Sequence, residues 1–64
     1  MNQIREWRVR RGLSQEDLAK TIGCDRTYIS ALERNMHEAR VSTLREIANA
    51  LRCDVRELIE REAV

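Results

Sequence analysis

The sequence predicts an all-α fold, a compact domain of five short helices. Proline, which breaks helices, is absent, and glycine occurs only twice. Apolar residues recur at helical spacing, i, i+3 and i+4, along most of the chain. A chain of 64 residues has the length of one small domain with a modest core. We therefore expect residues 1–64 to form a single domain.

The first helix is expected from Asn2 to Arg11. Ile4 and Trp7 face inward at helical spacing with Arg8 in the same phase, so Trp7 is expected in the core. Gly12 can end this helix, because glycine adopts a positive φ without strain.

The second helix is expected to begin after Ser14, its N-cap, with Asp17 placed three residues on as in a capping box. A buried stripe follows at Leu18, Ala19 and Ile22. Gly23 is expected at the sharp turn after this helix, because it tolerates φ > 0. Cys24 is expected to fill the core beneath that turn.

The third helix is expected from its N-cap, Asp25, to about Arg34, with Asn35 ending it in the left-handed conformation. Ile29 and Leu32 face inward. The opposite face carries Arg26, Thr27, Ser30, Ala31 and Arg34, with Tyr28 at its edge. Two short helices joined by a three-residue turn form a helix-turn-helix. This arrangement places the start of the second helix in a DNA major groove.

Two further helices complete the predicted domain. Ser42 is expected to cap the fourth, and its inward residues are Leu44, Ile47, Ala48 and Leu51. Asp54 is expected to cap the fifth, with Glu57 three residues later and an apolar set formed by Val55, Leu58 and Ile59. This set spans more surface than one short helix needs for its own core, so part of it is expected to join two copies in a dimer. The alternative is that all three residues close the core of the monomer.

The composition argues against several functional classes. The two cysteines are read as small buried residues, with a redox-sensing thiol at Cys24 as the alternative. The single histidine, His37, lacks the spacing of a metal site, and no nucleophile lies beside a base. We therefore expect no metal, no cofactor and no enzymatic activity. No apolar run suits a signal peptide or a membrane span, so a cytoplasmic, nucleoid-associated protein is expected.

The charge is distributed unevenly, although the net charge is only +1. Residues 1–34 hold seven Lys or Arg and five Asp or Glu, whereas residues 35–64 hold five and six. Sequence-independent attraction to phosphates should therefore be modest and sensitive to salt.

Four motifs carry a family resemblance: GLSQEDLAKTIG, DRTYISALER, VSTLREIANAL and VRELI. In this order they resemble the phage-repressor or Cro type of helix-turn-helix domain, a lambda-repressor-like fold, over about residues 4–60. The run DRTYIS, followed by ERN, also resembles controller proteins of restriction–modification systems. The resemblance implies a homodimer on a near-palindromic operator of double-stranded DNA. Relatives often have glycine at the positions of Asn35 and Arg52.

The resemblance also assigns roles to individual residues. It implies that Gln15 contacts a phosphate, that Arg26, Thr27 and Ala31 face bases, and that Arg8 pairs with Glu33. Arginine can bind guanine O6 and N7 together, and threonine can contact a thymine methyl group. The DNA backbone is the expected partner of Tyr28, Ser30, Arg34 and Asn35. For Arg26 and Thr27 the alternative is a solvated first turn, and for Tyr28 a half-buried packing role.

These observations favour a sequence-specific transcriptional regulator with its third helix in the major groove. The first alternative is an antitoxin or adaptor whose main partner is a protein and for which DNA is secondary. The second is a purely structural helical module. A gel shift on the protein's own upstream DNA at two salt concentrations would discriminate among them.

Overall fold

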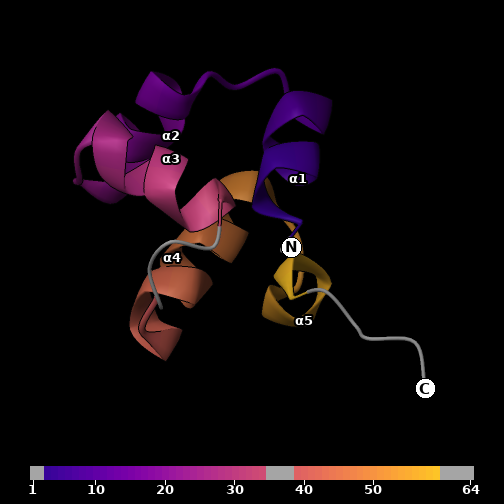
Figure 1. Ribbon diagram of the computed structural model, residues 1–64. Helices are drawn as coiled ribbons and strands as arrows, with labels where there is room; N and C mark the ends of the chain where they lie inside the picture. The colour runs from indigo at the N-terminus through magenta and orange to yellow at the C-terminus, as the bar shows by residue number, and fades with distance from the viewer. Residues whose placement is uncertain (1–2, 35–38, 60–64) are drawn as a thin grey trace.

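The computed structural model describes residues 3–34 and 39–59, and these contain α-helices and no strand (Figure 1). The helices are α1 (Ile4–Arg10), α2 (Gln15–Ile22), α3 (Arg26–Glu33), α4 (Val41–Leu51) and α5 (Val55–Leu58). The predicted all-α class and the order of the five helices are confirmed. None of the described helices has the length and apolar character needed to cross a membrane.

The α2–turn–α3 unit forms as its sequence predicts. The Ser14 hydroxyl accepts from the Asp17 amide at 2.9 Å, and the Asp17 carboxylate accepts from the Ser14 amide at 3.0 Å. Gly23 ends α2 in the left-handed region, with φ 77° and ψ 39°. Asp25 has the extended backbone of an N-cap residue, but its side chain accepts no capping hydrogen bond. The capping box therefore fixes the start of α2 and Gly23 forms the turn, whereas the Asp25 carboxylate makes no capping hydrogen bond at the start of α3.

Every helix contributes to one core. The largest fully buried side chains are Ile4, Leu18, Ile29, Leu32, Ile47, Leu51 and Leu58. Cys24 and Cys53 are free thiols that pack against the edge of this core. Because Ile29 and Leu32 of α3 are buried in this core, the helix cannot rotate about its axis. Their burial therefore decides which face of α3 is exposed to solvent.

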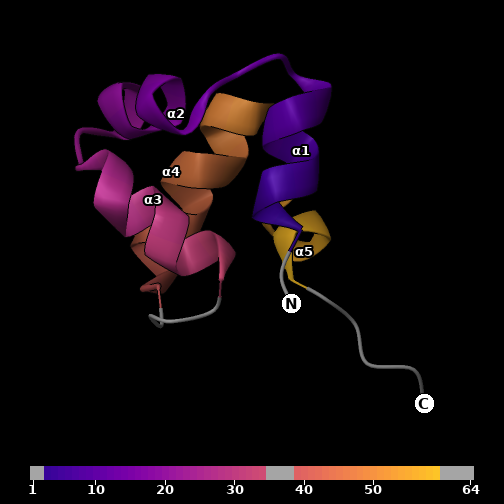
Figure 2. The ribbon, with the colours of Figure 1, turned by 45° about the horizontal axis from the view of Figure 1, so that its top comes forward.

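Helix α3 packs against α2 and α1 (Figure 2). In this view α2 and α3 lie on one side of α4, while α1 and α5 lie on the other. Helix α2 contacts both α3 and α4, and α1 contacts α3 and α4. The amide of Gln3 donates to the carbonyl of Leu58 at 2.9 Å, which ties the start of the described chain to the end of α5.

The end of α4 is closed by Arg11, the residue that follows α1. Arg52 follows α4 in the left-handed region, with φ 56°, and it is the only described residue other than glycine with a positive φ. Arg11 donates through Nε to the carbonyl of Leu51 at 2.8 Å and through Nη2 to the carbonyl of Arg52 at 3.0 Å. The guanidinium therefore satisfies carbonyls that a helix C-terminus leaves without intrahelical partners.

Some predicted helix boundaries were wrong. Helix α4 begins one residue before Ser42, with Arg40 as its N-cap, and Leu44 donates to the Arg40 carbonyl at 2.9 Å. Starting the helix earlier leaves its inward face unchanged, so packing did not require the serine to be the cap. Helix α1 runs from Ile4 to Arg10, a shorter span than expected. Asn2 and the expected left-handed residue Asn35 lie outside the described residues.

Candidate DNA-binding interface

The outer face of α3 begins with two exposed residues, Arg26 and Thr27. Ile29 is completely buried and Leu32 is 2% exposed, so the helix is fixed by its inner face. Tyr28 and Ser30 are half-buried at the side of the helix, and Arg34 follows as its exposed C-cap residue. The first turn of α3 thus presents the polar side chains of Arg26 and Thr27 to solvent, on a helix whose inner face is buried.

Ala31 departs from the expected outward position. It is only 9% exposed, and it lies outside the main core cluster. A single methyl group does not project past longer neighbouring side chains, so a position on the outer half of a helix does not by itself expose an alanine.

The ion pair expected between Arg8 and Glu33 is present and almost fully buried. Arg8 Nε donates to Glu33 Oε2 at 2.7 Å, and Nη2 donates to Oε1 at 3.4 Å. The side chains are 12% and 5% exposed, respectively. The remaining nitrogen, Nη1, donates to the carbonyl of Leu13 at 2.8 Å. The pair therefore joins α1 to α3 and also holds the loop between α1 and α2.

Gln15, the first residue of α2, extends this contact to the surface. Its Nε2 donates to Glu33 Oε1 at 3.1 Å. Its Oε1 accepts from Nη1 of Arg26 at 3.3 Å. A continuous hydrogen-bonded chain therefore runs from Arg8 through Glu33 and Gln15 to Arg26. We call these four residues the Arg8–Arg26 chain.

All four members of the Arg8–Arg26 chain were candidate residues from the sequence, but the hydrogen bonds of Gln15 to Glu33 and Arg26 were not predicted. Gln15 is 18 positions from Glu33 and 11 from Arg26. No helical periodicity relates such separations, because they join different helices. Only the packing of α2 across α3 brings these side chains together.

Local interactions also set the ionisation of nearby groups. The Ser14 amide, followed by its hydroxyl, holds the pKa of Asp17 below the ordinary range for aspartate. Burial raises the pKa of the Cys24 thiol, and the carboxylates of Asp25 and Glu46 raise it further. Cys24 therefore remains a neutral thiol at neutral pH, which argues against the alternative of a reactive redox sensor.

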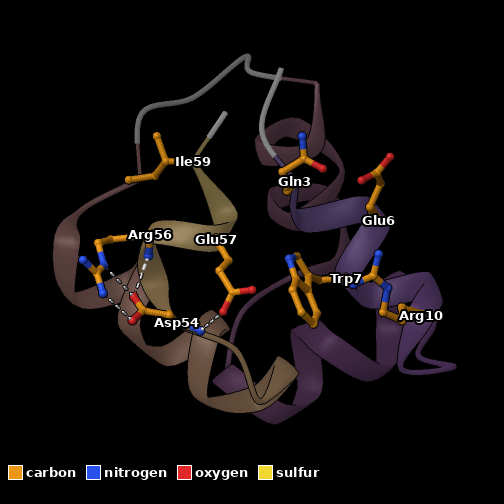
Figure 3. Close-up of a pocket in the computed structure, with 8 residues that line it drawn as sticks. All are labelled: Gln3, Glu6, Trp7, Arg10, Asp54, Arg56, Glu57 and Ile59. Atoms are coloured by element: carbon orange, nitrogen blue, oxygen red, sulfur yellow. Dashed lines mark hydrogen bonds and ion pairs between the residues drawn. The ribbon is translucent and has the colours of Figure 1, made fainter. Parts of the chain in front are cut away.

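A second feature lies away from α3, in a hollow of about 580 Å³ between α1 and α5 (Figure 3). One wall is Trp7, with the guanidinium of Arg10 4.6 Å from its ring centroid. Trp7 is half-buried against the core and not enclosed by it, so its expected core position is only partly right.

The three apolar residues expected at a dimer interface, Val55, Leu58 and Ile59, differ in how far they are buried. Leu58 is 1% exposed and belongs to the core, so it offers no surface to a second copy, and its assignment was wrong. Val55 is half-buried against the same core. Ile59 is 54% exposed and lines the hollow beside Trp7.

Comparison with known proteins places the chain in a family. The helix-turn-helix family model matches residues 4–58, which is most of the chain. A hypothetical transcription factor of Neisseria meningitidis serogroup B is 46% identical over 48 residues, covering 75% of this chain. This chain spans only 45% of that relative. The control protein C.SmaI of Serratia marcescens is 39% identical over 61 residues, covering 95% of this chain and 73% of the relative.

Solved structures agree with the family match. The restriction-modification controller protein C.AhdI of Aeromonas hydrophila superimposes with a TM-score of 0.84 at 38% identity, covering 89% of this chain and 86% of the other. SinR of Bacillus subtilis, a master regulator for biofilm formation solved in complex with DNA, gives a TM-score of 0.81 at 28% identity, covering 88% of this chain and 90% of the other. This chain belongs to the helix-turn-helix family, and its fold is that of the controller and repressor-type regulators.

Proposed function

We propose that this protein is a sequence-specific transcriptional regulator that binds double-stranded DNA with α3 in the major groove. The observation that carries the proposal is the exposed first turn of α3, where Arg26 and Thr27 project from a helix whose inner face is buried. Recognition helices of this class contact base edges with their N-terminal residues. The solved complex of the related SinR with DNA supports the same partner.

The proposed roles follow from exposure and reach. Arg26 reads a guanine, and Thr27 contacts the neighbouring base pair. The DNA backbone is contacted by Tyr28, Ser30 and Arg34 beside that turn, and by Gln15 at the start of α2, where aligned amides attract a phosphate. Ala31 faces a base only through the small part of its methyl group that is exposed. Asn35, the remaining expected backbone contact, lies outside the described residues.

The protein is proposed to act as a homodimer on a near-palindromic operator. One recognition helix reads only a few base pairs, and a two-fold axis doubles that number. Half-sites about one turn of DNA apart, roughly 34 Å, are then expected. With Leu58 in the core, Ile59 and the half-buried Val55 are the residues of the expected interface that keep apolar surface. Sedimentation across the micromolar range tests this step, and a persistent monomer that binds its operator as one protein per site contradicts it.

The DNA-binding proposal is tested by footprinting on genomic DNA, followed by titration of the footprinted site. Arg26→Ala should weaken binding to that site by about 1–3 kcal/mol and remove preference at one base pair per half-site. Arg5→Ala, which removes the same charge from an exposed position on α1, is the matched control. Equal weakening of the operator and of random DNA by Arg26→Ala would show that Arg26 does not read a base.

A further inference from the structure

Helix α1 is joined by hydrogen bonds both to α3 and to the segment around α5. Arg8, within α1, pairs with Glu33 at the end of α3. The N-cap residue Gln3 donates its amide to the carbonyl of Leu58, the last residue of α5, at 2.9 Å. The C-cap residue Arg11 contacts the other end of this segment, where α4 passes into α5. Helix α1 therefore connects the proposed DNA-binding helix to the helix of the proposed dimer interface.

Helix α5 depends on its surroundings for its direction, because it has only four residues, about one helical turn. Its capping box, formed by Asp54 and Glu57, fixes the shape of that turn, since both residues belong to it. Leu58, which is 1% exposed, anchors the last residue of α5, whereas Val55 at its start is half-buried. The direction of α5 therefore depends on how its start is held by residues 52–54, which we call the α4–α5 junction.

Arg11 holds the α4–α5 junction through two successive carbonyls. Its Nε donates to Leu51 at 2.8 Å and its Nη2 donates to Arg52 at 3.0 Å. These carbonyls belong to the peptide groups on either side of Arg52, so one planar guanidinium orients both. The guanidinium of Arg11 also lies over the ring of Trp7, 5.2 Å from its centroid, and Trp7 lines the same hollow as Asp54 (Figure 3). The start of α5 is thus tied to α1 by a side chain that is itself held on an aromatic ring.

We infer that Arg11 is a positioning residue for the dimer on DNA: by holding the α4–α5 junction to α1, it fixes the direction of α5 relative to α3. The placement of the two recognition helices of a dimer depends on that direction, because each α3 is joined to the two-fold axis through its own α5. This inference rests on the proposed function, with α3 as the DNA-binding helix and α5 as the dimer contact.

Three equilibria depend on the junction in different ways. Binding of one half-site needs α3, and dimerisation needs the apolar surface of α5 at Val55 and Ile59. Binding of the full operator needs both recognition helices to meet their half-sites while the two α5 helices stay paired. A junction that is already fixed loses less conformational freedom in this step and raises the effective concentration of the second α3 at its half-site. Loosening the junction should therefore weaken binding of the full operator and leave the other two equilibria unchanged.

The test uses Arg11→Met in the full chain. Methionine keeps an unbranched side chain beside Trp7 and removes the guanidinium donors. Affinity is measured at one salt concentration for the footprinted operator and for a duplex of equal length in which one half-site is replaced by unrelated sequence. Sedimentation gives the dimer constant of each variant. The ratio of full-operator affinity to half-site affinity should fall about threefold to tenfold, the range expected when one more segment is ordered on binding. The half-site affinity and the dimer constant should not change.

Arg10→Met is the matched control. It removes the same charge one residue earlier, from a guanidinium that stacks on Trp7 at 4.6 Å but takes no part in the bonds to Leu51 and Arg52. This variant should leave the ratio unchanged. Arg11→Lys keeps the charge but lacks the planar fork that binds two carbonyls together, so it should lower the ratio part of the way. Melting curves show whether each variant is folded at the assay temperature, and Arg11→Lys carries the test if Arg11→Met is not.

The outcomes separate this inference from the proposed function. If the Arg11 variant leaves the ratio unchanged, or lowers both affinities by one factor, Arg11 does not position α5 and the inference is wrong, while the proposed function stands. A weaker dimer constant that accounts for the whole loss on the operator also overturns the inference, because Arg11 then acts on the interface itself. If the unsubstituted protein binds the full operator no more tightly than the half-site, the proposed dimer is wrong and the inference fails with it.

Discussion

Replacing Glu33 by alanine should destabilise the domain by about 3–5 kcal/mol, because the change leaves a buried arginine without its carboxylate. The side chain of Arg8 is only 12% exposed, and two of its three side-chain hydrogen bonds end on Glu33. After the substitution, only the bond to the carbonyl of Leu13 remains. The charge of Arg8 persists, since a guanidinium is not deprotonated in proteins.

This loss is large for a domain of 64 residues. Ordinary stability for this length is about 3–10 kcal/mol. A shift of about 4–8 °C in melting temperature per kcal/mol then predicts a decrease of at least about 12 °C. Urea unfolding followed by circular dichroism measures the free energy directly, and thermal melts give the corresponding midpoint.

Glu16→Ala is the matched control. It removes a carboxylate whose ion pair with Lys20 is long, at 3.7 Å, and exposed, with side chains 67% and 77% accessible. This control should cost about 0.5 kcal/mol or less. Replacing Arg8 and Glu33 together by methionine should recover part of the Glu33→Ala loss, because no unpaired charge is left buried. A Glu33→Ala variant that loses no more stability than Glu16→Ala would refute the assignment of a buried, stabilising pair.

Three further predictions concern helix ends and thiols. Arg52→Gly should raise stability by about 0.5–1 kcal/mol by relieving the positive φ, and Arg52→Ala, which keeps a Cβ, should show no such gain in the same melts. Hydrogen bonds hold the pKa values of Asp17 and Asp54 below the ordinary aspartate range, so their stabilisation is present above about pH 4 and is lost as the pH falls through the lowered values. The melting temperature should therefore fall as the pH is lowered, and it should fall less steeply when both Asp17 and Asp54 are replaced by asparagine. Equal slopes of melting temperature against pH for the two proteins would contradict this prediction. In a Cys53→Ser background, alkylation of Cys24 at neutral pH should be slower in the folded protein than in urea, and equal rates would show that its pKa is not raised by burial.

Much of the fold was predictable because its signals are local. A capping box needs only residues three apart, and both Ser14–Asp17 and Asp54–Glu57 form as predicted. Gly23 takes the positive φ expected of it. The spacing of apolar residues within each helix identified the inner faces, since that spacing depends only on the helical period.

Exposure at the margins of those faces was decided by tertiary packing. Leu58 and Ile59 are adjacent apolar residues, but one is enclosed by the core and the other is 54% exposed. Trp7 is more exposed than its expected core position implies, and Ala31 is less exposed than its expected outward position implies. Helical phase gives the direction in which a side chain leaves its helix, whereas burial depends on which neighbouring helix covers it and where that helix ends.

The candidate site shows the same division. The sequence by itself determined that α2 and α3 form a helix-turn-helix and that Arg26 begins the second helix, because turns, caps and periodicity act over a few residues. Only the tertiary structure decided that Gln15 bridges Glu33 and Arg26. Side chains on different helices meet at distances set by how the helices pack, and no spacing along one chain encodes those distances.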